Sequence, residues 1–531
     1  MKRIFRPLYL SLALAFVLAS CGSQKMVSTP VENIDNLPLK TTPIAENDLI
    51  RWSHLDLVKD TIPGMSVDKA YKELIKGKKG KKVIVGIVDS GVDINHEDLK
   101  GVIWTNPKEI AGNGIDDDKN GYIDDVHGWN FLGDAVHEQL EMTRIVKKGP
   151  GTPDYDKAKA QLEEELKGIQ PQKQQLDFIL NAEKTIVNHL KKNDFTIEEV
   201  KAIQSDDTSV RQAKALFSQI LSKSTKAEFD KQIEEFKDYI YGQVNYNLNV
   251  EFDGRKIVGD NPDDLNDTKY GNNNVIGPEP NEAKHGTHVA GIVAQVRGNG
   301  LGGDGVTNNA QIMTLRAVPN GDEYDKDIAL AIRYAVDNGA KVINGSFGKY
   351  YSQHKEWVMD AIKYAESKDV LVVIAAGNES YDLDVTNKYP NDTYDGSPEY
   401  AKNVLIIGAL SPSYGSKVIA DFSNYGKNNV DIYAPGDEIY ATTPLNSYEY
   451  LQGTSMASPN VAGVATLIRS YYPKLTAVQV KQIIMESGTP LKNQVVIGED
   501  KHKANFADAS KSGRIVNAYN ALLLAAKMSK K

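Results

Sequence analysis

Short apolar runs rich in β-branched residues recur along this chain and constrain its fold more than any other feature. The first occupies residues 82–88, and similar runs occupy residues 311–315, 341–344, 370–375 and 404–408. Such runs are typical of strands that are buried on both faces of a parallel sheet. Helical patterns lie between them, as at residues 325–338 and 354–367. This alternation predicts an α/β fold with a doubly wound, mostly parallel sheet, in which the loops at the carboxyl ends of the strands carry the chemistry.

One stretch, residues 134–245, departs from that alternation because it is rich in Lys, Glu and Gln and has a helical period. Thr225 and Glu228 form the pattern of a capping box, and an apolar stripe follows at Phe229, Ile233, Phe236 and Ile240. Pro171 and the polar pairs at residues 193–194 and 206–207 are expected to interrupt the helical segment. We therefore expect an all-α insertion that packs on itself or on the α/β domain, which then comprises residues 50–133 and 246–527. A helical hairpin that docks a partner is the alternative.

The composition is that of a soluble globular protein, with 41% apolar and 25% charged residues. The formal net charge is −9. Nucleic-acid binding needs a concentrated basic surface, and no such surface is visible in this sequence. The charge pattern therefore excludes nucleic acid as the main partner.

The N-terminus has the pattern of a targeting segment. Three basic residues precede an apolar run at residues 8–18, which is too short to span a membrane as a helix. Residues 18–21, Leu-Ala-Ser-Cys, resemble the lipobox of bacterial lipoproteins, and Cys21 is the only cysteine in the chain. We expect a signal peptide at residues 1–20, lipidation of Cys21, and a polar tether at residues 21–49. An ordinary secretory signal with an incidental cysteine is the alternative.

Three short segments offer a carboxylate, an imidazole and a hydroxyl at places where an α/β fold presents functional side chains. Asp89 ends the first apolar run, His285 opens a helix-compatible segment of small residues, and Ser455 precedes an apolar helix at residues 461–468. A serine hydroxyl becomes an effective nucleophile when an imidazole accepts its proton, and a buried carboxylate orients that imidazole. Asn378, after the run at residues 370–375, would donate to an oxyanion together with the backbone N–H of Ser455.

The order Asp, His, Asn, Ser resembles that of the subtilase family, with DSG at 89–91, HGTHVAG at 285–291, AAGN at 375–378 and GTSMASP at 453–459. The resemblance implies a subtilisin-like serine endopeptidase that needs no cofactor for catalysis. It assigns the catalytic base to His285 and a structural role to His288. It also implies that the backbone of Ser346, Phe347 and Gly348 pairs with a polypeptide substrate. An inactive protease scaffold that acts as a binding lipoprotein is the rival interpretation.

Asp89 and His285 lie much farther apart in sequence than in compact subtilisins, and part of the extra chain resembles a metal loop. Oxygen-bearing side chains alternate around Gly121 as in the first half of an EF-hand, at Asp116, Asp118, Asn120 and Asp124. The twelfth loop position is His127 instead of the usual Glu. A structural calcium ion would therefore need another carboxylate, from Asp125 or from residues 260–274. A solvated acidic loop is the alternative.

Together these patterns predict an exported serine endopeptidase that touches a bacterial membrane through its lipid anchor only. The segment between Cys21 and residue 52 is too short for the inhibitory propeptide that many family members carry. The enzyme would either fold unaided or use the helical insertion for that purpose.

Overall fold

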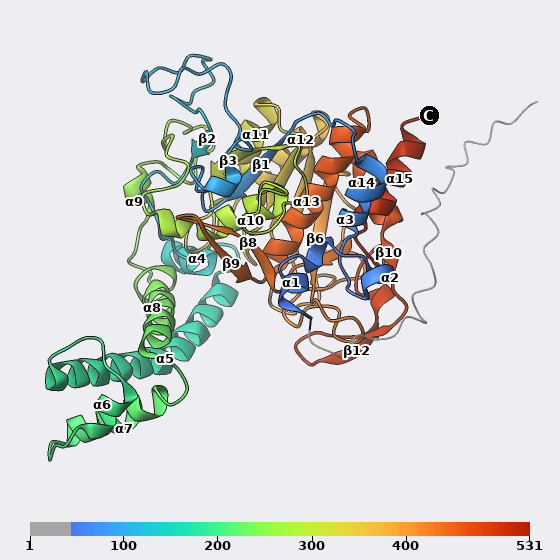
Figure 1. Ribbon diagram of the computed structural model, residues 1–531. Helices are drawn as coiled ribbons and strands as arrows, with labels where there is room; N and C mark the ends of the chain where they lie inside the picture. Colours follow the sequence, from blue (N-terminus) through green and yellow to red (C-terminus); the bar gives the residue numbers. More distant parts are fainter. Residues whose placement is uncertain (1–43, 395, 531) are drawn as a thin grey trace, which may run out of the picture.

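A mostly parallel nine-stranded sheet forms the centre of the protein (Figure 1). The computed structural model describes residues 44–394 and 396–530, so the expected signal peptide and Cys21 lie outside the described residues. The strand order is β10-β13-β7-β6-β5-β4-β1-β3-β2, and only the pair β10–β13 is antiparallel. The strands are β1 (Val83–Asp89), β2 (Gly128–Asn130), β3 (Ala310–Arg316), β4 (Val342–Gly345), β5 (Leu371–Ala375), β6 (Val404–Leu410), β7 (Ile432–Pro435), β10 (Thr489–Pro490) and β13 (Arg514–Ile515).

The five apolar runs of the sequence form the middle of this sheet, as β1, β3, β4, β5 and β6. Nearly every residue of these strands is buried, because helices cover both faces of the sheet. On β1, Gly86 leaves room for Ala335, whose methyl group would lie 3.1 Å from a Cβ at that position. The mostly parallel α/β architecture that the sequence predicts is therefore confirmed.

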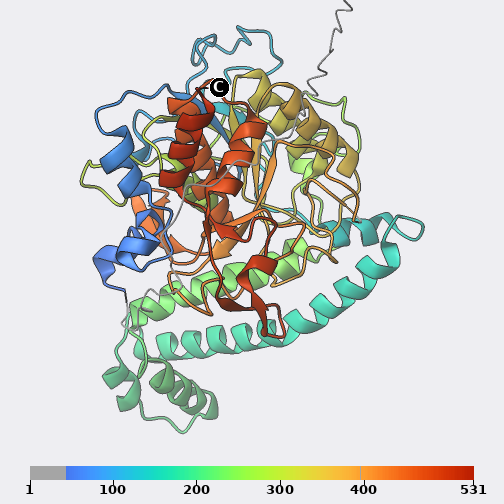
Figure 2. The same ribbon diagram turned by 90° about the vertical axis from the view of Figure 1, so that its right-hand side faces the viewer.

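Two buried helices, α10 (Lys284–Ala294) and α13 (Thr454–Tyr471), pack together against the sheet. The other face is covered by α11 (Asp325–Asp337) and α12 (Lys355–Ser367) (Figures 1 and 2). Other helices are α1 (Glu46–Leu49), α2 (Leu57–Asp60), α3 (Val67–Ala70), α9 (Arg255–Val258), α14 (Ala477–Ser487) and α15 (Ala518–Met528). Two antiparallel pairs lie outside the main sheet, β8 (Ile439–Thr443) with β9 (Ser447–Leu451) and β11 (Gln494–Ile497) with β12 (His502–Asn505). Helix α1 falls within the stretch expected to be a tether.

Residues 141–247 form a projecting set of helices, which we call the helical arm (Figures 1 and 2). Its helices are α4 (Glu141–Lys148), α5 (Tyr155–Leu190), α6 (Ile197–Ala202), α7 (Thr208–Ile220), α8 (Lys226–Gly242) and the π-helical turn η5 (Gln243–Asn247). The arm has its own apolar core, to which Phe217, Phe229 and Ile240 contribute. Thr225 and Glu228 do form a capping box at the start of α8.

The expectation that Pro171 interrupts the helical segment is wrong, because α5 continues through it for a total of 36 residues. A proline removes one backbone hydrogen bond from a helix interior and disfavours the helix there. Here the buried side chains on either side of Pro171, Ile169 and Leu176, both belong to the arm's core. Tertiary packing therefore keeps the helix continuous. Among the described residues, no helix is both long and apolar enough to cross a membrane.

Candidate active site

Asp89 and His285 meet at the carboxyl edge of the sheet, although 196 residues separate them in sequence. Asp89 is the last residue of β1 and is 1% exposed, and its Oδ1 lies 2.6 Å from Nδ1 of His285. The same Oδ1 accepts the backbone N–H of Ser90 at 2.8 Å. A Cβ at position 286 would lie only 2.1 Å from the carbonyl oxygen of Gly91. Glycine at 286 therefore allows helix α10 to bring His285 this close to β1.

Two opposing influences set the pKa of His285. Burial of the imidazole lowers the pKa, whereas the charge of Asp89 and its hydrogen bond raise it. The contributions of Asp89 prevail, so the pKa of His285 is raised above its usual value. The imidazole nevertheless remains open to the cleft, with 38% of its side chain exposed.

Ser455 is the second residue of α13, where the first backbone N–H groups of the helix have no partner within it. Its hydroxyl donates to the carbonyl oxygen of Ser346 at 3.2 Å. Among the described residues, the Ser455 hydroxyl makes no hydrogen bond to His285. Such catalytic hydrogen bonds are often long or misaligned in free enzymes and tighten when substrate binds. The structure thus pairs Asp89 directly with His285, and it joins Ser455 to Ser346 by a hydrogen bond.

The amide of Asn378 has a fixed orientation beside Ser455. Its Oδ1 accepts both the backbone N–H of Thr454 at 2.8 Å and the hydroxyl of Thr454 at 2.9 Å. The amide nitrogen makes no hydrogen bond within the described part of the chain. The Nδ2 hydrogens are therefore available to another acceptor. Thr454, which holds this amide through both hydrogen bonds, was not among the site residues predicted from the sequence.

The segment Ser346–Gly348 follows β4 and lines a cleft of about 330 Å³ together with Asp89 and His285. The Ser346 hydroxyl donates to the carbonyl of Ser455 at 2.8 Å, which ties this segment to α13. The ammonium group of Lys388 donates to the carbonyl of Phe347 at 3.1 Å. Burial lowers the pKa of Lys388, and the charges of Glu323 and Glu379 oppose that effect. Lys388 was missed in the sequence because nothing near it marks a buried cation.

The cleft wall carries acidic side chains. Burial raises the pKa of Glu323 and of Glu282, which both line the cleft. Arg316 also lines it, but its guanidinium donates to three backbone carbonyls and to the side chain of Asn130. Arg316 therefore supports the surrounding loops, and burial lowers its pKa to about 10.

Two further histidines are structural. His288 is buried, one of its ring nitrogens contacts the carbonyl of Glu449 at 3.1 Å, and burial lowers its pKa to about 3. It is therefore neutral, and its contact supports a structural role instead of a role as the base. His96, in the turn after β1, is also buried, with 1% exposed. Its two nitrogens contact the carbonyl of Ser447 and the backbone N–H of Asp98.

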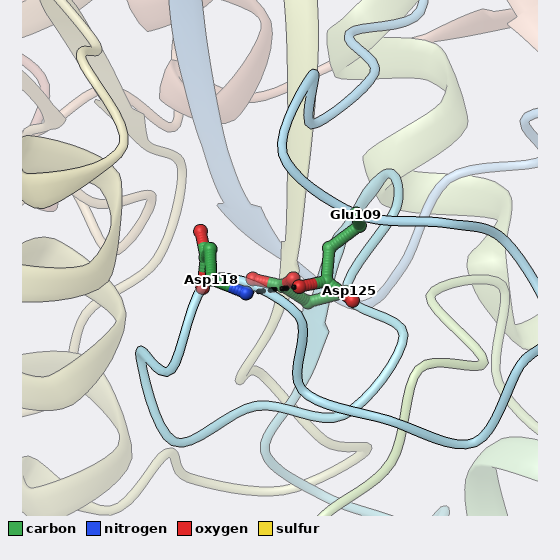
Figure 3. A group of neighbouring side chains, drawn as sticks. All are labelled: Glu109, Asp118 and Asp125. Atoms are coloured by element: carbon green, nitrogen blue, oxygen red, sulfur yellow. Dashed lines mark hydrogen bonds between the residues drawn. The ribbon is translucent and has the colours of Figure 1, made fainter.

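Three carboxylates, those of Glu109, Asp118 and Asp125, lie together in the loop after β1 (Figure 3). They offer oxygen atoms within 4.8 Å of one another, which suits a hard cation. Oxygen Oε2 of Glu109 is buried and has no partner among the described residues. Asp125 is fully buried, and burial raises its pKa to about 6 against the hydrogen bonds from neighbouring side chains. These donors and the unpaired oxygen fit a calcium ion.

Of the four residues predicted to bind metal, only Asp118 belongs to this group. Asp116 accepts backbone N–H groups of Asn120 and Gly121, and Asp124 accepts those of residues 112–114. The side chain of Asn120 donates to Asp125 at 2.8 Å. From the second acidic stretch, Asp260 forms ion pairs with Arg255 and Lys326 instead.

Comparison with known proteins gives matches across most of the chain. A sequence model described as the Subtilase family matches residues 80–502. The chain is 43% identical over 187 residues to the thermophilic serine proteinase of Bacillus sp. (strain AK1), covering 35% of this chain and 42% of that protein. It is 39% identical over 187 residues to thermitase of Thermoactinomyces vulgaris, covering 35% of this chain and 61% of that protein. It is 32% identical over 274 residues to subtilisin-like protease 1 of Plasmodium vivax, covering 46% of this chain and 41% of that protein. Each match spans less than two thirds of the relative's own length.

Proposed function

This chain belongs to the subtilase family, and from that premise we propose that it is a serine endopeptidase that hydrolyses peptide bonds through Asp89, His285 and Ser455. The observation that carries the proposal is the 2.6 Å contact between the buried Asp89 carboxylate and His285. Both line one cleft with Ser346, whose carbonyl accepts the Ser455 hydroxyl. A carboxylate, an imidazole and a hydroxyl in this order are the groups that nucleophilic acyl transfer requires.

In the proposed reaction, His285 accepts the proton of the Ser455 hydroxyl while the Ser455 oxygen attacks the peptide carbonyl. Asp89 holds the Nδ1–H of His285 in place and stabilises the imidazolium that forms. The imidazolium then gives its proton to the departing amine, which leaves an ester on Ser455. Water attacks this ester with His285 again acting as base, and the acid product departs as the Ser455 hydroxyl is restored.

The negative charge on the tetrahedral intermediate needs two donors. Nδ2 of Asn378 is one, because Thr454 binds the amide oxygen and leaves the amide nitrogen free to donate. The backbone N–H of Ser455 at the start of α13 is the second. Ser346, Phe347 and Gly348 would pair with the main chain of an extended polypeptide in the cleft.

A fluorophosphonate probe tests the proposal, because it reacts covalently only with an activated serine. We expect purified wild-type protein to be labelled and Ser455→Ala to remain unlabelled. Ser470→Ala is the matched control, since Ser470 lies on the same helix and its hydroxyl has no partner among the described residues. This control should be labelled like the wild type. Absence of Ser455-dependent labelling would refute the enzyme and favour a binding role for an inactive scaffold.

We further propose that the protein is exported and held on a bacterial membrane by a lipid on Cys21. The support is the basic, apolar and small-residue order of residues 2–21, which ends in the only cysteine of the chain. Two acyl signals at one residue would anchor the protein stably. In a bacterial host, Cys21→Ser should move the protein from the membrane fraction to the soluble exported fraction. Unchanged membrane association of that variant would refute the anchor.

A calcium ion is the last part of the proposal, and its support is the fit of Glu109, Asp118 and Asp125 to a hard cation. A bound ion would offset two of the three negative charges of these carboxylates and stabilise the loop between β1 and β2. It would take no part in the chemistry at Ser455.

A further inference from the structure

The loop that carries Asn378 is anchored on both sides by one buried side chain, Asn424. Asn424 is 0% exposed and comes from a distant part of the chain. Its side-chain and backbone groups bind four residues around Asn378: the carbonyls of Ala376 and Gly377 at 2.8 and 3.0 Å, and the backbone N–H groups of Glu379 and Tyr381 at 3.1 and 2.8 Å. The position of the loop is therefore determined by hydrogen bonds on either side of Asn378.

A single carboxylate oxygen, Oε2 of Glu379, joins this anchor to Asn378 itself. It accepts the backbone N–H of Asn378 at 2.8 Å and the side-chain amide of Asn424 at 3.1 Å. It also accepts the hydroxyl of Tyr350. That hydroxyl in turn accepts the amide of Asn424 at 2.9 Å. Tyr350, Glu379 and Asn424 therefore form a closed network, and the Asn378 N–H is bonded to it through Glu379. Burial and the nearby charge of Glu379 raise the pKa of Tyr350, which keeps the phenol protonated as a donor.

Tyr350 reaches this network from the segment that follows β4. It follows the segment Ser346–Gly348 by two residues, and its ring packs against the core of the helical arm. The next residue, Tyr351, is buried in that core and donates its hydroxyl to Gln161 of α5 at 2.8 Å. Tyr350 thus contacts the arm through its ring and the Asn378 loop through its hydroxyl.

We propose that Tyr350 is a positioning residue for the oxyanion donor Asn378, and that it links the helical arm to the catalytic loop. This inference rests on the proposed endopeptidase function. The Tyr350 hydroxyl orients Glu379, and Glu379 holds the backbone of Asn378, so that Nδ2 of Asn378 meets the developing oxyanion without reorganisation. Tyr350 itself does not touch the reacting atoms.

The variant Tyr350→Phe tests the proposal, because it removes the hydroxyl and keeps the ring that packs on the arm. Loss of one charge-assisted hydrogen bond should lower kcat about tenfold and leave KM within about twofold. Tyr351→Phe is the matched control, since it removes the neighbouring hydroxyl, whose partner lies on α5. Its kcat should equal that of the wild type.

A double-mutant cycle separates positioning from a general structural effect. In the Asn378→Ala background the oxyanion donor is already absent, so Tyr350→Phe should lower kcat by less than about twofold further. The same tenfold loss in both backgrounds would overturn the inference, and so would an unchanged kcat in the single variant. Fluorophosphonate labelling of the wild type is measured alongside. Its failure would refute the proposed endopeptidase instead, which keeps the two hypotheses distinguishable.

Discussion

Replacing Asp89 by Asn removes one negative charge beside His285 while it preserves the size of the side chain. Oδ1 of Asp89 accepts both His285 Nδ1 at 2.6 Å and the backbone N–H of Ser90 at 2.8 Å. Oδ2 is buried without a partner among the described residues. Because the Ser90 N–H needs an acceptor, the amide oxygen of Asn should take the Oδ1 position and the amide nitrogen the Oδ2 position. The variant then keeps the acceptor for His285 and loses mainly the charge.

The size of the effect follows from the attraction between Asp89 and the imidazolium that forms during attack. Two unit charges about 4 Å apart attract by about 4 kcal/mol at an effective dielectric constant near 20. With 38% of the His285 side chain exposed, solvent screens part of this attraction. About 2 kcal/mol remains if screening removes half. Asp89→Asn should therefore lower kcat/KM between about 30-fold and about 1000-fold.

The pH profile of Asp89→Asn gives an independent check. The base must be neutral, so kcat/KM rises as the pH passes the pKa of His285. Asp89 raises that pKa against the opposing effect of burial. Without the carboxylate, burial acts unopposed, and the acid limb of the profile should move to lower pH.

The assay is cleavage of a fluorogenic peptide from about pH 5 to pH 9, with active sites titrated by a fluorophosphonate. Asp360→Asn is the matched control, because it removes the same charge from a side chain on α12 that is 66% exposed. A loss below about fivefold together with an unmoved acid limb would refute the role assigned to Asp89. A loss well beyond 10⁴-fold would instead mean that the amide nitrogen faces His285 and imposes the wrong tautomer.

Three other predictions concern the rest of the site and its supports. Asn378→Ala should lower kcat about 10²- to 10³-fold with little change in KM, and this is the range found for the same donor in subtilisin itself. A loss of less than about fivefold in steady-state kinetics would contradict the assignment. A chelator should lower the melting temperature of the wild type, since a ligand at 100 times its Kd stabilises by about 2.7 kcal/mol. Scanning calorimetry should show that Glu109→Gln loses this sensitivity while Asp116→Asn keeps it; equal melting curves of the wild type with and without chelator would exclude the ion. Gly286→Ala should abolish peptide cleavage, because the added methyl group would lie 2.1 Å from the Gly91 carbonyl oxygen and displace α10. Full activity of this variant would contradict the packing argument.

The middle of the sheet could be predicted from sequence because parallel strands with both faces covered are continuously apolar. Strand β2, at three residues, was not predicted, since so short a segment has no recognisable period. Helix α5 was divided at Pro171 because local propensity argues for a break there, whereas the arm's core holds the helix together. Local sequence thus predicts long elements well and misjudges places where packing overrides propensity.

The positions of the candidate catalytic residues could be predicted because each lies in a contiguous motif at the end of a strand or the start of a helix. The residues that support them could not. Tyr350, Lys388 and Asn424 act through hydrogen bonds to groups that are remote in sequence, and no local pattern distinguishes them. The loop motif at residues 116–124 likewise indicated a cation site. The carboxylate group in the structure contains Asp118 of this motif and Asp125, which was expected beside it, but also Glu109, which precedes the motif.

The chain enters and leaves the helical arm at adjacent points. The rings of His137 and Tyr246 stack with centroids 4.0 Å apart, and the backbone N–H of Leu140 donates to the carbonyl of Asn247 at 3.0 Å. The arm therefore lengthens the chain between Asp89 and His285, but it does not increase the distance in space that this segment must cross. Once the arm has folded, closing the loop between these two residues requires less conformational entropy than their sequence separation implies. A short linker in place of the arm would leave strands β1 and β3 in register. An insertion of this kind can therefore be added to a sheet protein, lengthened or removed while the pairing of carboxylate and imidazole persists.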